Sequence, residues 1–127
     1  MAERIELPEP TLRHLSRWYS TDLLENTAVL RGSLFGWLFG RFGQHAVTVN
    51  GSVNLTSRAP ELDSDRGIRL IGHELFHVVQ QQEMGWWGFF ARYVWAWRPA
   101  QIKSGRGHPM ERPAYERGDA IMASLQE

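Results

Sequence analysis

The sequence contains no cysteine, which excludes disulfide bonds, thiolate metal ligands and thiol-based catalysis. Its formal net charge at pH 7 is zero and it has no run of like charges, so neither a nucleic acid nor an anionic membrane surface is expected as a partner. No apolar stretch reaches membrane-spanning length, and we expect no transmembrane segment. The first residues lack the basic and then apolar regions of a signal peptide. We therefore expect a cytoplasmic protein, with export by a non-classical route left open.

The composition is that of a folded protein. Apolar residues make up 43% of the 127 positions, and six of them are tryptophans. A chain of this kind can bury a core of ordinary size, whereas disordered segments are poor in aromatic residues. We expect a single domain over residues 1–127.

The most specific motif lies between Gly72 and Gln80, where His73 and His77 flank Glu74. Residues four apart share one face of a helix, so both imidazoles can bind one metal ion. The Glu74 carboxylate lies on nearly the same side, where it can reach a water molecule held by that metal. This H-E-x-x-H arrangement is typical of zinc metalloproteases. It predicts one Zn²⁺ per chain, with Glu74 as general base.

The residues around this motif predict a buried helix. Capping candidates at residues 63–65 precede it, and the Met-Gly pair at 84–85 can end it. Most positions that the motif leaves free are apolar: Leu70, Ile71, Leu75, Phe76, Val78 and Val79. A lone histidine in such a helix usually only satisfies local hydrogen bonds. Two at this spacing, with glutamate between them, favour metal binding.

A catalytic zinc site needs three protein ligands and one open position for water. Because the chain has no cysteine, the third ligand must be a histidine, an aspartate or a glutamate. The segment 108–119 holds the candidates, namely Glu111, Glu116 and His108.

Three stretches together resemble a known family. They are a strand with a small turn at 46–55, a His-Glu-Leu-x-His-Val-x-Gln helix within 73–81, and a Pro-x-Glu-Arg-x-Ala segment within 109–115. The chain is similar, over roughly residues 22–122, to the small gluzincin-type metalloproteases. These include the minigluzincins and the DUF4157-like domains associated with extracellular contractile injection systems. The resemblance implies Glu111 as the third ligand. Pro113 departs from the pattern, because a helix former is usual there, but proline is tolerated in a first helical turn.

The resemblance further implies an α+β, zincin-like fold, in which a small, mainly antiparallel sheet packs on the active-site helix. Family members often carry an acidic residue where Tyr115 stands, so a carboxylate behind the histidines must come from elsewhere, and Asp119 is a candidate. A second group must also stabilise the oxyanion. Tyr115, His108 and Arg112 are the candidates for that role.

A β-hairpin is expected over residues 46–56, because Asn50-Gly51 is a strong signal for a tight turn. In zincin-like proteins a sheet edge beside the active-site helix pairs with extended substrate. The resemblance therefore implies substrate binding by Val53, Asn54 and Leu55, through backbone hydrogen bonds. An ordinary hairpin with both edges covered is the alternative.

Other elements are expected at both ends of the chain. Helical spacing predicts an N-terminal helix from about Thr11 whose buried face includes Leu15 and Tyr19. A short strand is expected at 27–30 and a short, poorly regular helix at 32–40. A C-terminal helix should carry the third ligand.

The segment 85–97 is rich in aromatic residues and predicts a helix that ends at Arg98-Pro99, followed by a loop at 101–107. Trp87 and Trp95 fall off its apolar stripe, so contact with a partner or with a second copy of the chain through this Trp-rich segment is open. The stripe itself should pack on the active-site helix, and its members are Trp86, Phe89, Phe90, Tyr93 and Trp97.

These observations favour a zinc-dependent metallopeptidase that hydrolyses peptide bonds in a peptide or protein substrate. The alternative function is a zinc-stabilised binding or scaffold module with weak or no proteolysis, associated with a contractile injection system. In that alternative the metal supports the fold and Glu74 is dispensable.

Overall fold

The computed structural model describes residues 2–96 and 108–126. It has the expected α+β architecture, with four strands and six helices in the described residues. In chain order the elements are β1 (Glu3–Ile5), α1 (Glu9–Leu15), α2 (Thr21–Asn26), β2 (Val29–Arg31), α3 (Leu34–Arg41), β3 (Ala46–Val49), β4 (Ser52–Leu55), α4 (Asp65–Met84), α5 (Trp86–Ala96) and α6 (Glu111–Leu125).

The strands form one mixed sheet in the order β1-β2-β4-β3. The β1–β2 and β3–β4 pairs are antiparallel, but β2 and β4 run parallel. Two of the three pairings thus fit the expected mainly antiparallel sheet, and the parallel β2–β4 pair makes it a mixed one. The physical reason is that the chain leaves β2, forms α3 and returns through β3, so that β4 pairs with β2 in the same direction. β1 was not anticipated from the sequence.

The predicted hairpin is confirmed, with β3 and β4 joined by a two-residue turn. Asn50 has φ 48° and Gly51 has φ 79°. Positive φ at both central positions is the backbone of a type I′ turn, which matches the twist of paired strands and suits the Asn-Gly sequence. β3, the first strand of this hairpin, lies at the edge of the sheet and contacts α4.

The central helix α4 begins and ends where the sequence predicts. The Ser64 side chain caps it by accepting a hydrogen bond from the Gly67 backbone N–H, and Gly85 with φ 74° follows its last residue. Only glycine fits at position 67, because the Cβ atom of any other residue would collide with the carbonyl oxygen of Glu61. This close approach brings the preceding loop onto the first turn of α4.

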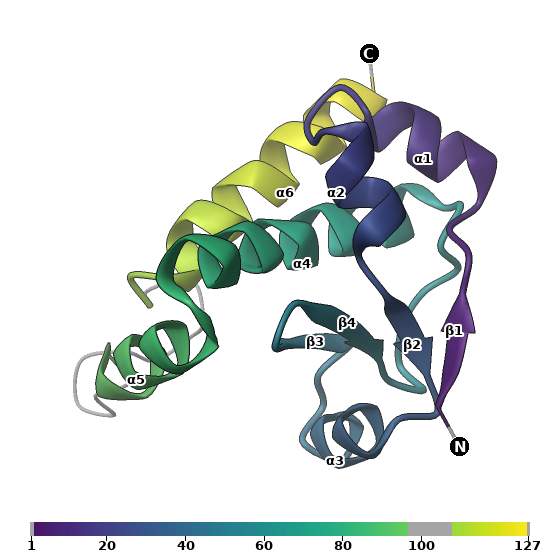
Figure 1. Ribbon diagram of the computed structural model, residues 1–127. Helices are drawn as coiled ribbons and strands as arrows, with labels where there is room; N and C mark the ends of the chain where they lie inside the picture. The colour runs from purple at the N-terminus through teal and green to yellow at the C-terminus, as the bar shows by residue number, and fades with distance from the viewer. Residues whose placement is uncertain (1, 97–107, 127) are drawn as a thin grey trace.

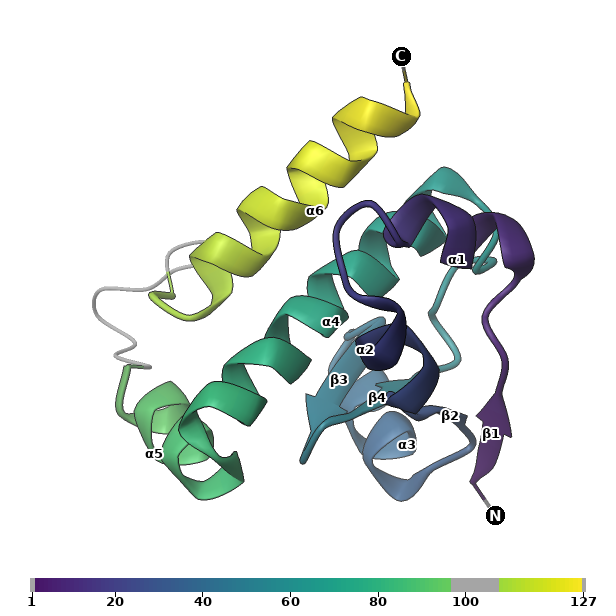
Figure 2. The same cartoon turned by 45° about the horizontal axis from the view of Figure 1, so that its top comes forward.

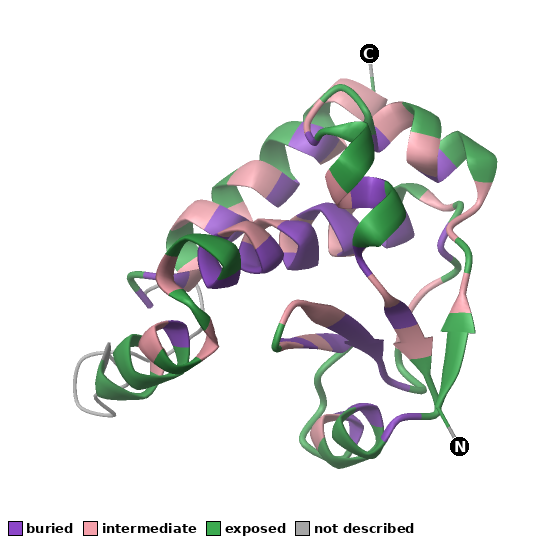
Figure 3. Ribbon diagram, viewed as in Figure 1, coloured by how far each residue is buried: buried purple, intermediate pink, exposed green. Residues whose placement is uncertain are grey.

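Helix α4 is the centre of the molecule, with the sheet on one side and α6 on another (Figures 1 and 2). Figure 3 shows that nearly the whole length of α4 is buried or half-buried. Its core neighbours include Leu15 from α1, Val53 and Leu55 from β4, and Ile121 from α6, all of them almost fully buried. Burying these side chains supplies the main stabilisation of the fold.

The shorter helices and strands are of the type that the sequence predicts, but their lengths differ from the predicted ones. α1 ends at Leu15, so Tyr19 reaches the core from the turn after the helix and donates a hydrogen bond to the Gly72 carbonyl oxygen. The strand expected at 27–30 is β2, and the helix expected at 32–40 is α3. α2 was not anticipated. None of the described helices has both the length and the apolar character to cross a membrane.

α5 is helical as expected, but its buried stripe is narrower. Phe89 is buried and Tyr93 is half-buried, whereas Phe90 is exposed against expectation. The off-stripe residues Trp87 and Trp95 are both about three-quarters exposed. Trp97, the end of the helix at Arg98-Pro99 and the loop at 101–107 lie outside the described residues.

Candidate metal centre

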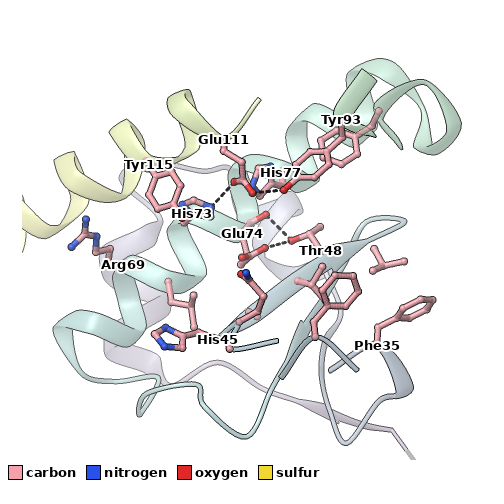
Figure 4. A pocket seen from close by; sticks show the side chains of 18 of the residues that line it. Phe35, His45, Thr48, Arg69, His73, Glu74, His77, Tyr93, Glu111 and Tyr115 are labelled. Carbon is pink, nitrogen blue, oxygen red and sulfur yellow. Dashed lines mark hydrogen bonds and ion pairs between the residues drawn. The ribbon is translucent and has the colours of Figure 1, made fainter. Parts of the chain in front are cut away.

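Three side chains from two helices converge at one point. His73 and His77 point from the middle of α4 toward Glu111, the first residue of α6 (Figure 4). The Glu111 Oε1 atom lies 3.1 Å from His73 Nε2 and 2.6 Å from His77 Nε2. The three ligand atoms lie within 4.8 Å of one another. The structure thus brings the two motif histidines and the favoured third candidate together.

This donor set fits a zinc ion. Two imidazole nitrogens and a carboxylate oxygen are a familiar combination at open zinc sites. Ligand atoms about 2.0–2.1 Å from a common tetrahedral centre lie roughly 3.3 Å apart. The distances to Glu111 Oε1, 3.1 Å from His73 Nε2 and 2.6 Å from His77 Nε2, are both shorter than that, so the carboxylate must move outward, chiefly away from His77, to accommodate the ion.

A glutamine fixes the orientation of His77. The His77 Nδ1 atom lies 2.8 Å from Gln80 Oε1, and Gln80 Nε2 donates to the carbonyl oxygen of Met110 at 3.0 Å. Because the amide oxygen of Gln80 can only accept, Nδ1 carries the proton and Nε2 is left to face the cluster. Since Met110 immediately precedes Glu111, Gln80 also ties α4 to the start of α6.

The charges at the cluster favour an ionised Glu111 beside a protonated His77 in the metal-free protein. Burial raises the pKa of Glu111, but hydrogen bonds from His73, His77 and Tyr93 and the charge of His77 outweigh it and hold this pKa well below its usual range. Burial lowers the pKa of His77, but the hydrogen bond to Glu111 and the charges of Glu74 and Glu111 outweigh it and raise it to about 9.

This protonation state predicts a proton release. A metal ion can bind His77 Nε2 only after the proton has left, and at pH 7 that proton is bound because the pKa is about 9. We expect Zn²⁺ binding at pH 7 to release about one proton per chain, and affinity to rise with pH up to about pH 9. Titration calorimetry in two buffers of different ionisation enthalpy measures the number released. Heats that are identical in both buffers would contradict this protonation state.

Glu74 lies on the same helix face, beside the cluster. Its side chain is buried, and its Oε2 atom accepts a hydrogen bond of 2.6 Å from Thr48 Oγ1 on the edge strand β3 (Figure 4). Both residues line the same cleft as the two histidines. Thr48 thus holds one carboxylate oxygen of Glu74 and leaves the other available to the cleft.

The cleft has a volume of about 810 Å³ and is walled by α3, β3, α4, α5 and the start of α6. Its two sides differ in character. Phe35 and Tyr93 lie on one side of the cluster, and His45 and Arg69 lie on the other (Figure 4). The apolar wall is continued by Phe39, Trp86, Phe89 and Phe90.

The expected pairing of substrate with Val53, Asn54 and Leu55 is corrected. These residues form β4, which is paired on one side with β2 and on the other with β3, and all three are buried. Their backbone groups are therefore used within the sheet. β3 is the strand at the edge of the sheet beside the cluster, because it is the last strand in the order β1-β2-β4-β3.

The remaining candidates differ in their distance from the cluster. Tyr115 lies at it, with its ring 4.5 Å from that of His73. Asp119 forms an ion pair with Arg69, whose side chain lines the cleft. Arg112 and Glu116 are exposed, and neither is among the residues that line the cleft.

His108 takes neither of the roles considered for it. It is fully buried, its Nδ1 accepts from the Met110 backbone N–H at 3.0 Å, and its Nε2 donates to the Tyr93 carbonyl oxygen at 2.8 Å. With both ring nitrogens facing backbone atoms, His108 joins α5 to the turn before α6 and does not enter the cluster.

Thr48, Gln80 and Tyr93 contact the cluster residues but were not singled out as site residues from the sequence. Gln80 carried a usable signal, because three residues after His77 it lies on the same helix face. Thr48 and Tyr93 carried none, because their contacts span 26 and 18 residues along the chain.

Comparison with known families gives a match over residues 6–85 to the family described as the eCIS core domain. The matched segment covers more than half of the chain and includes the two histidines and Glu74, but it ends before Glu111. No curated protein and no solved structure matches this chain.

Proposed function

The chain belongs to the eCIS core domain family, and on that premise we propose that it is a zinc-dependent peptidase of the gluzincin kind, acting in the setting of a contractile injection system. The observation that carries the proposal is the convergence of His73, His77 and Glu111 at a cleft that also holds the buried carboxylate of Glu74. A structural zinc site has no need of a fourth, non-ligating carboxylate beside an open position.

The chemistry divides between the ion and the chain. Bound Zn²⁺ would acidify a water molecule and polarise the carbonyl of the substrate. Glu74 accepts the proton of the attacking water as its oxygen forms a bond to the carbonyl carbon, and then passes the proton to the amide nitrogen as the C–N bond breaks. The Thr48 hydroxyl keeps one Glu74 oxygen in place during both transfers. Tyr115, beside His73, is the candidate for stabilising the oxyanion.

The edge strand β3 offers a place for the substrate backbone. The Val53 N–H donates to the Ala28 carbonyl oxygen, away from β3, so the Thr48–Val53 pair exchanges no hydrogen bonds and the backbone groups of Thr48 point out of the sheet. The Thr48 carbonyl oxygen accepts from Gln81 Nε2 at 3.0 Å, which leaves the Thr48 N–H for a substrate. Ala46, two residues earlier, presents its backbone in the same direction. An extended peptide can add to this edge, with an apolar side chain against the aromatic wall of the cleft.

A second candidate function is a zinc-stabilised binding or scaffold module in an assembly. The observation that favours it is the description of the matched family, which names a core domain and no enzymatic activity. In this case the exposed face of α5, with Trp87 and Trp95, is the surface that a partner would contact.

The experiment that separates the two functions uses purified protein with measured metal content. We expect about one zinc per chain, and cleavage of an unstructured peptide library that stops on chelation and returns when Zn²⁺ is added back. Mass spectrometry of the products identifies the cleaved bonds. Full zinc occupancy without cleavage would favour the scaffold function, and absence of bound transition metal after reconstitution would defeat both.

A further inference from the structure

The second oxygen of Glu111 has a partner of its own. While Oε1 lies between the two imidazoles, Oε2 accepts a hydrogen bond of 2.7 Å from the Tyr93 hydroxyl of α5. We propose that Tyr93 is a positioning residue of the metal centre, which holds Glu111 so that a single carboxylate oxygen is presented to the ion. This inference rests on the metal site of the proposed function.

The position of the Tyr93 hydroxyl is set by the contacts of its ring with two neighbouring rings. The ring stacks on His108 with centroids 4.3 Å apart and lies 5.6 Å from that of Phe89. His108 in turn donates to the Tyr93 carbonyl oxygen and accepts from the Met110 N–H. The buried His108 imidazole therefore connects the backbone of α5 at Tyr93 to Met110, the residue before Glu111. This connection keeps the Tyr93 hydroxyl close to the Glu111 carboxylate.

This arrangement has a chemical consequence for the site. A carboxylate with one oxygen engaged by a neutral donor is restrained from turning both oxygens toward the ion. The position that the second oxygen would occupy then stays open to water or substrate. Without the phenol, Glu111 would be free to swing, and the site would lose both its orientation and its open position.

The effect can be measured without any peptide, by titrating the protein with Co²⁺ as a visible probe and with Zn²⁺ in competition with a chelator. We expect Tyr93→Phe to weaken binding of both ions by about 10- to 100-fold. We also expect the visible bands of bound Co²⁺ to lose intensity, because an added carboxylate oxygen raises the coordination number. The phenyl ring keeps its stacking on His108, so the variant should fold.

Tyr19→Phe is the matched control. It also removes a buried tyrosine hydroxyl, which donates to the Gly72 carbonyl oxygen and has no contact with Glu111. We expect it to lower the unfolding midpoint to a similar extent and to leave the Co²⁺ spectrum unchanged.

A double-mutant cycle with Glu111→Gln separates positioning from a general structural effect. If Tyr93 acts through the carboxylate, Tyr93→Phe has little further effect on metal affinity in the Glu111→Gln background. An unchanged spectrum and affinity in Tyr93→Phe, or an equal loss in both backgrounds, would overturn the inference while leaving the proposed function standing. A wild-type chain that binds neither Co²⁺ nor Zn²⁺ would overturn both.

Discussion

Replacing Glu74 with glutamine is expected to abolish peptide cleavage while the protein keeps its fold and its zinc. The carboxylate is not a ligand of the cluster, and glutamine fills the same volume, so the Thr48 hydroxyl retains an acceptor. The amide cannot take a proton from water, and general-base help is worth roughly a hundred- to ten-thousand-fold. The measurement is a peptide-library digest followed by mass spectrometry, with both proteins at equal zinc occupancy.

The control for this experiment is Glu83→Gln. Glu83 lies near the end of the same helix, is exposed and is not among the residues that line the cleft. Cleavage should be unaffected there. Products that persist in Glu74→Gln at the wild-type rate would point to a contaminating protease and would remove the support for a general base at this position.

Glu111→Ala is expected to weaken zinc binding far more than any other change in α6. Its Oε1 is the only carboxylate oxygen of the described cluster, and its loss leaves the two histidines with no third protein ligand. Removing a ligand affects affinity more than removing a hydrogen-bonded neighbour, which costs about 10- to 100-fold. Competition with a chromophoric chelator gives the dissociation constants.

Glu116→Ala is the matched control for that prediction, because Glu116 lies on the same helix and is exposed. We expect its zinc affinity to equal that of the wild type. We expect His108→Ala to lower affinity indirectly, through the lost packing on Tyr93 and the lost hydrogen bond from the Met110 N–H. An equal or greater loss in Glu116→Ala would show that the cluster is held by a different carboxylate from the one the structure brings to it.

The sequence by itself determined the elements whose signals are local. The i, i+4 spacing of His73 and His77 needs only a helix, and the cap at Ser64 and the glycine at position 85 mark the ends of that helix. Asn50-Gly51 likewise encodes its own turn, because both residues accept positive φ at little cost. These features depend on neighbours within a few residues, so composition and spacing predict them.

Only the tertiary structure decided which distant residues meet. The choice of Glu111 at the cluster depends on how α6 packs against α4, and the contacts of Thr48 and Tyr93 depend on the placement of β3 and α5. The same holds for the order of the strands, which leaves β3 at the edge and places β4 inside the sheet. Such contacts are selected by burial and hydrogen bonding across the whole core, and the spacing of residues along the chain does not predict them.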